Sequence, residues 1–169
     1  MKKSLCLLMV LLLFSLCLTS CGLSVPRPEI KSGEFNFSVT YEYAGEVKTV
    51  SGVYVCEFDG TDWVLDGGYH REWKGYIKGG DDDDQILLDT LDGGDEVILV
   101  LNLDPTYFMD DYNLELYGVP APYIMIKDYT DHGDYEGLSF IHDADEVAEL
   151  CGAKIVSYGY DEPIDNEFN

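Results

Sequence analysis

The chain has 169 residues, enough for one domain with a short appendage, and its 33 acidic and 10 basic side chains give a formal charge of −23. This balance excludes a nucleic-acid-binding role and a basic surface lying on anionic lipid, because both rely on Lys and Arg. A hydrophobic fraction of 46% and an aromatic fraction of 13% are too high for a disordered acidic tail, so a folded domain is expected.

The first residues follow the order of a secretory signal. Lys2 and Lys3 precede an uncharged apolar run over 5–18, which is shorter than the roughly 20 residues that a membrane-spanning helix needs. The segment Leu18-Thr19-Ser20-Cys21 resembles the lipobox of bacterial lipoprotein precursors. That resemblance implies cleavage before Cys21, a diacylglyceryl thioether on its sulfur, and an acylated Cys21 at the start of the mature chain.

The resemblance implies a signal peptide over 1–20. The Pro- and Ser-containing segment that follows and the β pattern from Glu34 onward add a lipidated tether over 21–33 and one β-rich domain over 34–169. Two acyl chains give a stable anchor where one gives reversible binding, so the expected location is the extracytoplasmic side of the cell membrane. The alternatives are an uncleaved anchor and an ordinary signal followed by a chance cysteine.

Cysteine usage follows from this division. Cys6 and Cys17 leave with the signal and Cys21 carries the lipid, so Cys56 and Cys151 remain in the mature domain. Outside the cell two cysteines can form a disulfide, but two buried thiols are as compatible with the sequence.

From Glu34 onward the pattern is that of β structure. Aromatic and aliphatic residues alternate with polar ones over 34–43, which predicts a half-buried strand with one apolar face: Phe35, Phe37, Val39 and Tyr41. A second strand is predicted over 47–58, followed by a hairpin loop over 59–62. Further strands are predicted over 63–65, 69–78, 85–90, 96–103, 123–127 and 154–160. In the 69–78 strand, Trp73 and Tyr76 are expected to face the core.

The end of the chain contains one predicted helix. Asp143 is a suitable N-cap with Glu146 three residues later, the apolar stripe over 144–151 has helical spacing, and Gly152 suits the residue after the helix. Residues 104–122, rich in proline and aspartate, are expected to be irregular with a short strand near 114–117. Together these elements predict an antiparallel β-sandwich or small barrel of about eight strands with one short helix near the C-terminus.

Two acidic loops are the candidate metal sites of the sequence. Asp81 to Asp84 offers the oxygen ligands that calcium prefers, but the order of ligands in an EF-hand is missing. A second cluster combines carboxylates with an imidazole: Asp128, Asp131, His132, Asp134 and Glu136. Both are better explained as solvated loops, and the sequence predicts no metal and no cofactor.

The chain lacks a recognisable catalytic arrangement. Ser139, His142 and Asp143 are close in sequence, but nothing places them in a cleft and no G-x-S-x-G motif is present. Carboxylates are so abundant that no pair of them indicates a glycosidase. The protein is therefore expected not to be an enzyme.

Tyrosines are concentrated in the least regular stretch. Tyr107, Tyr112, Tyr117 and Tyr123 lie among aspartates and prolines, with Phe108 beside the first of them. Tyrosine combines apolar area with a hydroxyl, so these four residues are the candidate binding residues, and aromatic rings beside carboxylates suit sugars. The alternative is that the rings close one end of the core.

The mature part resembles small acidic lipoproteins of gut Gram-positive anaerobes, through the stretch over 51–60, Trp63, Leu65, the Asp66-Gly67-Gly68 turn and the tail over 161–166. That group supplies no activity. Two functions remain: a surface-exposed binding module for a glycan or protein, and an acidic inhibitor or immunity-type protein whose charge attracts a basic partner.

Overall fold

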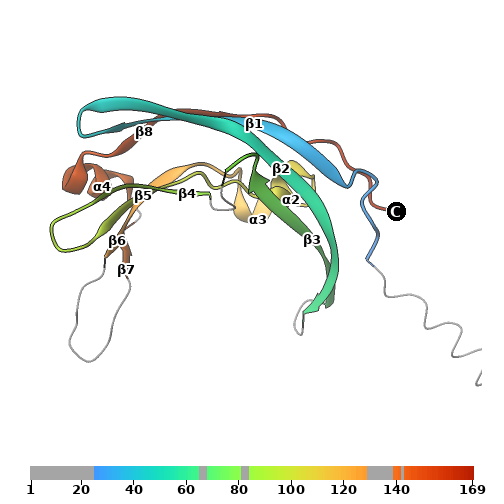
Figure 1. Cartoon of the computed structure of the whole chain (residues 1–169). Coiled ribbons are helices and arrows are strands. Elements are labelled where there is room, and N and C mark those ends of the chain that lie inside the picture. The colour runs from blue at the N-terminus through green and yellow to red at the C-terminus, as the bar shows by residue number, and fades with distance from the viewer. Residues whose placement is uncertain (1–24, 65–67, 81–83, 129–138, 142) are drawn as a thin grey trace, which may run out of the picture.

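The computed structural model describes residues 25–64, 68–80, 84–128, 139–141 and 143–169. The fold is mainly β, with two four-stranded antiparallel sheets that share one core and do not close into a barrel (Figure 1). The first sheet has the order β3-β2-β1-β8, formed by Gly68–Ile77, Glu46–Val64, Ser32–Tyr43 and Lys154–Tyr160. The second has the order β4-β5-β6-β7, formed by Gln85–Thr90, Glu96–Val100, Tyr123–Asp128 and Ser139–Ile141. The mainly β, antiparallel class predicted from the sequence is confirmed.

The alternation predicted for β1 is also confirmed. Its four apolar residues are buried, and the residues between them are exposed or half-buried: Phe35, Phe37, Val39 and Tyr41 form the buried face. Phe37 lies opposite Gly52 of β2, and its ring lies 3.0 Å from the position that a Cβ on Gly52 would take. The absence of a side chain at Gly52 therefore makes room for the ring.

The predicted hairpin loop over 59–62 is wrong. β2 continues through this segment to Val64, and the pairing with β3 shifts register between Phe58 and Gly60. Gly60 has a φ of 120°, a conformation that glycine adopts without strain, so the chain accommodates one extra residue as a bulge and stays in the sheet. Trp63 and Val64, predicted to open a separate strand, belong to the end of β2. The interruption predicted over 66–68 falls mostly on residues outside the described ranges, and Gly68 begins β3.

The expectation that Trp73 and Tyr76 both face the core is half right. Trp73 packs against Phe58 with ring centroids 5.4 Å apart, on the core side. Tyr76 lies on the opposite face, where its hydroxyl donates to Glu57 Oε1 at 3.4 Å. Residues three apart in a strand point to opposite faces, so they cannot both be buried on one side.

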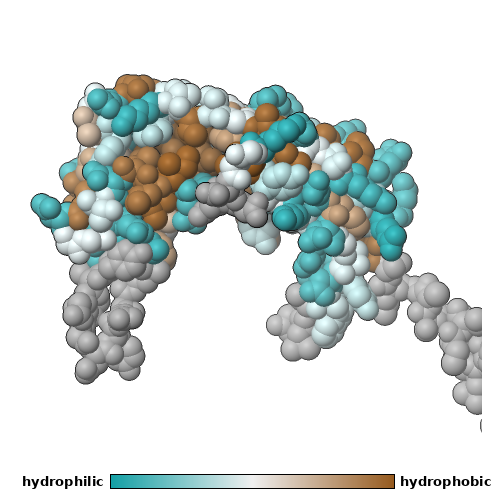
Figure 2. Space-filling view, viewed as in Figure 1, coloured by the Kyte–Doolittle hydropathy of each residue, from teal (hydrophilic) through white to brown (hydrophobic). Residues whose placement is uncertain are grey.

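β5 is the most buried strand, with apolar residues covered on both faces. It ends at Val100 rather than Leu103 as predicted, because Asn102 takes a φ of 53° and turns the chain toward α2. Ile86 and Leu88 of β4 are half-buried and pack against the core. Figure 2 shows apolar surface between the two sheets on this side of the molecule.

Short helices complete the fold. The predicted C-terminal helix is confirmed as α4 (Ala144–Cys151), with Asp143 Oδ1 accepting from the Asp145 and Glu146 N–H groups, and Gly152 left-handed at its end. The stretch over 104–122 contains two one-turn helices, α2 (Pro105–Phe108) and α3 (Leu114–Tyr117), so the strand predicted near 114–117 is wrong.

The core is centred on Phe108 of α2, which is completely buried between the sheets. Its ring lies 4.8 Å from the ring of Phe35, 5.7 Å from that of Tyr54 and 6.0 Å from that of Tyr160. Cys56 is buried in the same core and Cys151 is on α4, and both are free thiols. The sequence left open whether Cys56 and Cys151 form a disulfide, and in the structure they are not bonded to each other.

Candidate functional site

Three of the four predicted binding tyrosines lie together. The ring centroids of Tyr107 and Tyr112 are 5.9 Å apart, and those of Tyr112 and Tyr117 are 5.5 Å apart. We call these three residues the tyrosine cluster. It extends from Tyr107, which packs on buried Phe108, to Tyr117, which is 67% exposed. The rings therefore both close the core and present aromatic surface to solvent.

The fourth tyrosine, Tyr123, lies elsewhere. It is in β6 and lines a separate cavity of about 320 Å³ between that strand, α4 and β8, and no residue of the cluster lines that cavity. The sequence grouped it with the others because it follows the same irregular stretch. The strand that begins at Tyr123 carries it into the second sheet instead.

Local hydrogen bonds fix the segment that carries the cluster. Asp104 caps α2, with its Oδ1 accepting from the N–H and the hydroxyl of Thr106 at 2.8 and 2.6 Å. Asn113 caps α3, with its Oδ1 accepting from the Leu116 N–H at 3.0 Å. Between them Asp110 has a φ of 58°. Short polar residues tolerate these cap and left-handed positions, which explains the aspartates and asparagine of a stretch that the sequence left irregular.

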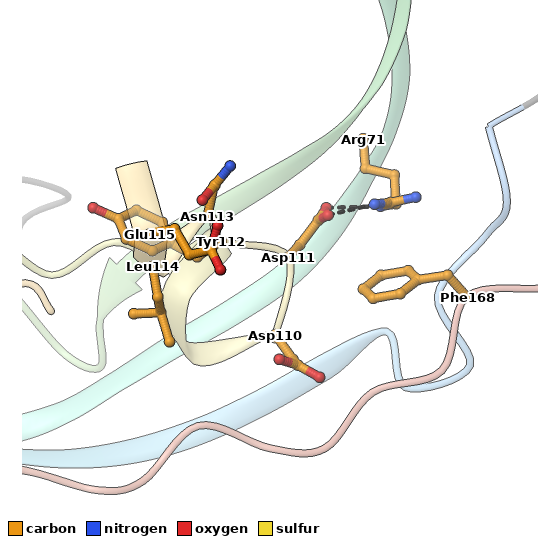
Figure 3. A pocket seen from close by; sticks show the side chains of 8 residues that line it. All are labelled: Arg71, Asp110, Asp111, Tyr112, Asn113, Leu114, Glu115 and Phe168. Atoms are coloured by element: carbon orange, nitrogen blue, oxygen red, sulfur yellow. Dashed lines mark hydrogen bonds and ion pairs between the residues drawn. The ribbon is translucent and has the colours of Figure 1, made fainter. Parts of the chain in front are cut away.

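The segment is attached to β3 through Asp111 (Figure 3). Arg71 donates to both carboxylate oxygens of Asp111, with 2.7 Å from Nε to Oδ2, and Trp73 Nε1 donates to Oδ2 at 2.8 Å. The two charged side chains are only 18% and 14% exposed. Asp111 and Arg71 therefore neutralise each other, and their pairing holds the tyrosine cluster beneath the first sheet.

The ends of the described chain meet at the same place. The Arg71 guanidinium lies 4.0 Å from the centroid of the Phe168 ring, and its Nη1 donates to the Pro26 carbonyl at 3.2 Å. Arg27 and Asn169 exchange two backbone hydrogen bonds of 2.8 and 2.9 Å. The C-terminal tail and the start of the chain thus form one wall beside the cluster.

Two adjoining shallow cavities, both widely open to solvent, lie at the cluster, and they share Asp111, Tyr112 and Asn113. The first, of about 490 Å³, is lined by eight residues: Arg71, Asp110, Asp111, Tyr112, Asn113, Leu114, Glu115 and Phe168 (Figure 3). The second, of about 310 Å³, is lined by Asp104, Thr106, Asp111, Tyr112, Asn113 and Tyr117. Their combined wall offers ring faces, carboxylates and an amide, the groups that hold a ligand rich in hydroxyls.

Two phenols of the tyrosine cluster, Tyr107 and Tyr112, have raised pKa values and stay protonated at physiological pH. Loss of hydration raises the pKa of Tyr112, and the negative charge of Asp104 raises it further. Loss of hydration also raises the pKa of Tyr107, with a smaller contribution from Glu162. Both hydroxyls can therefore donate as well as accept a hydrogen bond.

Sequence reasoning missed Arg71 and Phe168 as site residues. Period-two alternation does place Tyr69, Arg71 and Trp73 on one strand face, but the partner of Arg71 lies 40 positions away in the chain. No local pattern indicates such a contact. The same holds for Phe168, which comes from the last residues of the chain.

The other candidates from the sequence do not assemble into a site among the described residues. Asp143 serves as the cap of α4, and His142 and the cluster over 131–136 lie outside the described residues, as do Asp81, Asp82 and Asp83. Within the described ranges, no three His, Cys, Asp or Glu side chains come together as metal ligands.

In the same described part of the chain, no helix has the length and apolar character needed to cross a membrane. Comparison with known proteins gives no relative: no protein-family model, no curated protein and no solved structure matches this chain.

Proposed function

We propose that the protein is a non-catalytic binding module, held by a lipid on Cys21 at the extracytoplasmic face of the membrane, and that it binds a glycan at the tyrosine cluster. The observation that carries the proposal is the pair of adjoining cavities around Tyr112. Tyrosine faces stack on the C–H faces of sugar rings, and nearby carboxylate and amide groups bond their hydroxyls.

The charges around the cavities limit the charge that a bound glycan can carry. Asp104, Asp110 and Glu115 line the cavities, whereas the one lining base, Arg71, is taken up by Asp111, the Pro26 carbonyl and the Phe168 ring. An anionic polymer would be repelled by this wall and by the whole molecule. The glycan is therefore uncharged or carries amino groups.

The tether places this site close to the membrane. Arg71 bonds to Pro26, which is five residues after Cys21, and a chain of that length spans at most about 18 Å. A lipid on Cys21 would hold the tyrosine cluster near the bilayer surface and leave the opposite end of the sheets outward. Glycans near the base of the cell envelope are then the accessible ligands.

A glycan-binding assay with two matched tyrosine variants tests the site. Tyr117→Ala removes an exposed ring of the cluster and should weaken binding to a glycan array at least about tenfold, because interface aromatics contribute most of the binding energy. Tyr123→Ala removes a ring of similar chemistry from β6 and should leave binding unchanged. Equal effects of the two variants would contradict the proposal.

Lipidation is tested separately. Cys21→Ala should leave an unprocessed precursor and abolish metabolic labelling with a fatty acid, because Cys21 carries the thioether in the proposed mature protein. Labelling that persists in this variant would show that the lipid, if any, is attached elsewhere.

A second candidate function is binding of a basic partner protein, as an inhibitor or immunity-type protein does. It is favoured by exposed apolar side chains at α3 beside carboxylates, with Leu114, Leu116 and Val119 all more than half exposed. An apolar centre with a charged rim is typical of protein interfaces. An electrostatically steered complex should lose on-rate steeply as salt rises, whereas a glycan bound by stacking should not.

A further inference from the structure

The end of the β2–β3 hairpin carries an exposed aromatic pair that neither the tyrosine cluster nor the core uses. Trp63 of β2 lies directly opposite Tyr69 of β3, and the two side chains are 52% and 50% exposed. Residues directly opposite in an antiparallel pair share a face, with Cβ atoms about 4.5–5.5 Å apart. The two side chains therefore project side by side from one face of the hairpin end, and we call this pair the aromatic platform.

The platform faces the same side as the proposed binding site. Arg71 and Trp73 both bond to Asp111, which fixes the inner face of β3. Tyr69 is two residues before Arg71, and the ladder from Thr61–Arg71 to Trp63–Tyr69 is regular, so Tyr69 and Trp63 also point to the inner face. Tyr69 lies about 7 Å from Arg71 along the strand, on the side of the hairpin end. Arg71 lines the first cavity, and Trp63 and Tyr69 are the next residues of this hairpin that point to the same inner face.

The two faces of this hairpin end differ in charge. The inner positions are Thr61, Trp63, Tyr69 and Arg71, and the guanidinium of Arg71 is neutralised by Asp111. The outer positions include Asp62, His70 and Glu72, with 3.6 Å between His70 Nε2 and Glu72 Oε1. The chain as a whole has a charge of −23, yet these four inner positions carry no carboxylate. They do carry two exposed rings, and this composition is typical of a binding surface.

We infer that Trp63 and Tyr69 form a second subsite, and that the ligand is an extended, uncharged polysaccharide that continues from the tyrosine cluster onto this platform. The inference rests on the proposed glycan-binding function and adds a requirement for chain length. The occupant must be uncharged here, because the rings supply stacking and the Thr61 hydroxyl supplies hydrogen bonding. An anionic membrane surface fits less well, because the outer acidic residues of the same hairpin end would be repelled by it.

The experiment uses the full-length protein and two pairs of soluble probes: cellobiose with cellohexaose, and chitobiose with chitohexaose. Trp63→Ala and Tyr69→Ala should each weaken binding of the hexasaccharide about tenfold and leave the affinity for the disaccharide unchanged. Tyr117→Ala should weaken both lengths. His70→Ala, on the outer face of the same hairpin, is the matched control and should change neither.

The conservative variant Trp63→Phe keeps a ring and should retain hexasaccharide binding, which separates stacking from a folding defect. Fluorescence gives a second readout, because Trp63 is one of only two tryptophans and the other, Trp73, is bonded to Asp111. Addition of the hexasaccharide should shift the emission to shorter wavelength, and Trp63→Phe should remove that shift.

The failure of the second subsite and the failure of the proposed function would give different results. If Tyr117→Ala weakens both lengths while Trp63→Ala and Tyr69→Ala change neither, the second subsite is wrong and the proposed function stands. If the unaltered protein binds neither oligosaccharide series, the proposed function fails and the second subsite with it. If Trp63→Ala weakens the binding of Cys21→Ala protein to phosphatidylglycerol vesicles and His70→Ala does not, the platform contacts membrane and the inference is overturned.

Discussion

At the scale of single residues, tight ring contacts with glycine set the packing of the first sheet. A Cβ on Gly75 would lie 1.7 Å from the Tyr54 hydroxyl oxygen and 2.3 Å from Cζ of that ring. The same hydroxyl donates to the Leu103 carbonyl at 2.8 Å inside the core. A methyl group at Gly75 would therefore displace a buried ring and break its hydrogen bond.

We expect Gly75→Ala to lower the free energy of unfolding by about 2–4 kcal/mol, from overpacking and from the lost buried hydrogen bond. Gly159→Ala is the matched control: it is also in the first sheet, with no atom within 4 Å of the added Cβ. Gly159→Ala should be neutral or stabilise by up to about 1 kcal/mol. Urea unfolding of both variants measures the difference, and equal effects would contradict the contact.

Buried titratable groups make the fold sensitive to alkali. Burial raises the pKa of the Cys56 thiol to about 12, with a smaller contribution from the charge of Asp104. Burial also raises the pKa values of Tyr54 and Tyr160 above the usual tyrosine range. Each of these groups holds its proton more tightly in the folded state than in the unfolded state.

Stability should therefore be constant up to the pKa of an unfolded thiol, about 8.5, and fall as pH rises toward 12. Each group adds a slope of up to about 1.4 kcal/mol per pH unit, and the tyrosines contribute only above about pH 10. Urea unfolding at about pH 8 and pH 10 should show the fall, and Cys56→Ala should flatten it. An unchanged slope in Cys56→Ala would assign the effect to another group.

At the scale of elements, the two faces of β1 differ completely in environment. Phe37 is 4% exposed and packs over Gly52, whereas its neighbour Ser38 is exposed on the outer face opposite Ser51. A strand of this kind fixes its register through the buried side, since a slip of one residue would exchange the faces.

We expect Phe37→Ala to cost about 3–5 kcal/mol of unfolding free energy, because the large ring leaves a cavity in the core. Ser38→Ala, one residue away, should change the unfolding free energy by less than about 0.5 kcal/mol. Chemical denaturation of both variants provides the measurement. A small effect of Phe37→Ala would mean that the inner face of β1 is assigned to the wrong side.

At the scale of the whole molecule, the acidic side chains are dispersed. In the described residues they cap helices, pair with exposed lysines or line the turns, as in the contact of Lys78 Nζ with Glu34 at 2.8 Å. No described set of three converges as a metal site. We expect the charge to act mainly through mutual repulsion between tethered copies and through solubility.

The midpoint of thermal unfolding should then rise to a similar extent with calcium and with magnesium at matched ionic strength, and only at millimolar levels, because screening does not distinguish the ions. A built site would respond to micromolar calcium by mass action on the folded state. A rise of many degrees at micromolar calcium, removed by Asp82→Asn with Asp84→Asn or by Asp131→Asn with Asp134→Asn, would contradict this prediction.

The sequence alone determined the features that depend on neighbours in the chain. Period-two alternation located β1 and its buried face, and the cap residues Asp143 and Gly152 located α4. The succession of short strand patterns separated by turn residues gave the β-rich antiparallel class, and the clustering of tyrosines indicated three residues of the candidate site. Each of these signals acts over a few residues, where backbone geometry and side-chain spacing are set locally.

The tertiary structure decided whatever depends on distant partners. Gly60 forms a bulge rather than a turn because β3 continues to pair with β2 beyond it. Asp111 becomes an attachment point only because folding brings it to Arg71, and Tyr123 leaves the cluster because β6 joins the second sheet. The binding surface is thus assembled by packing between segments far apart in the sequence, and local periodicity carries no information about such contacts.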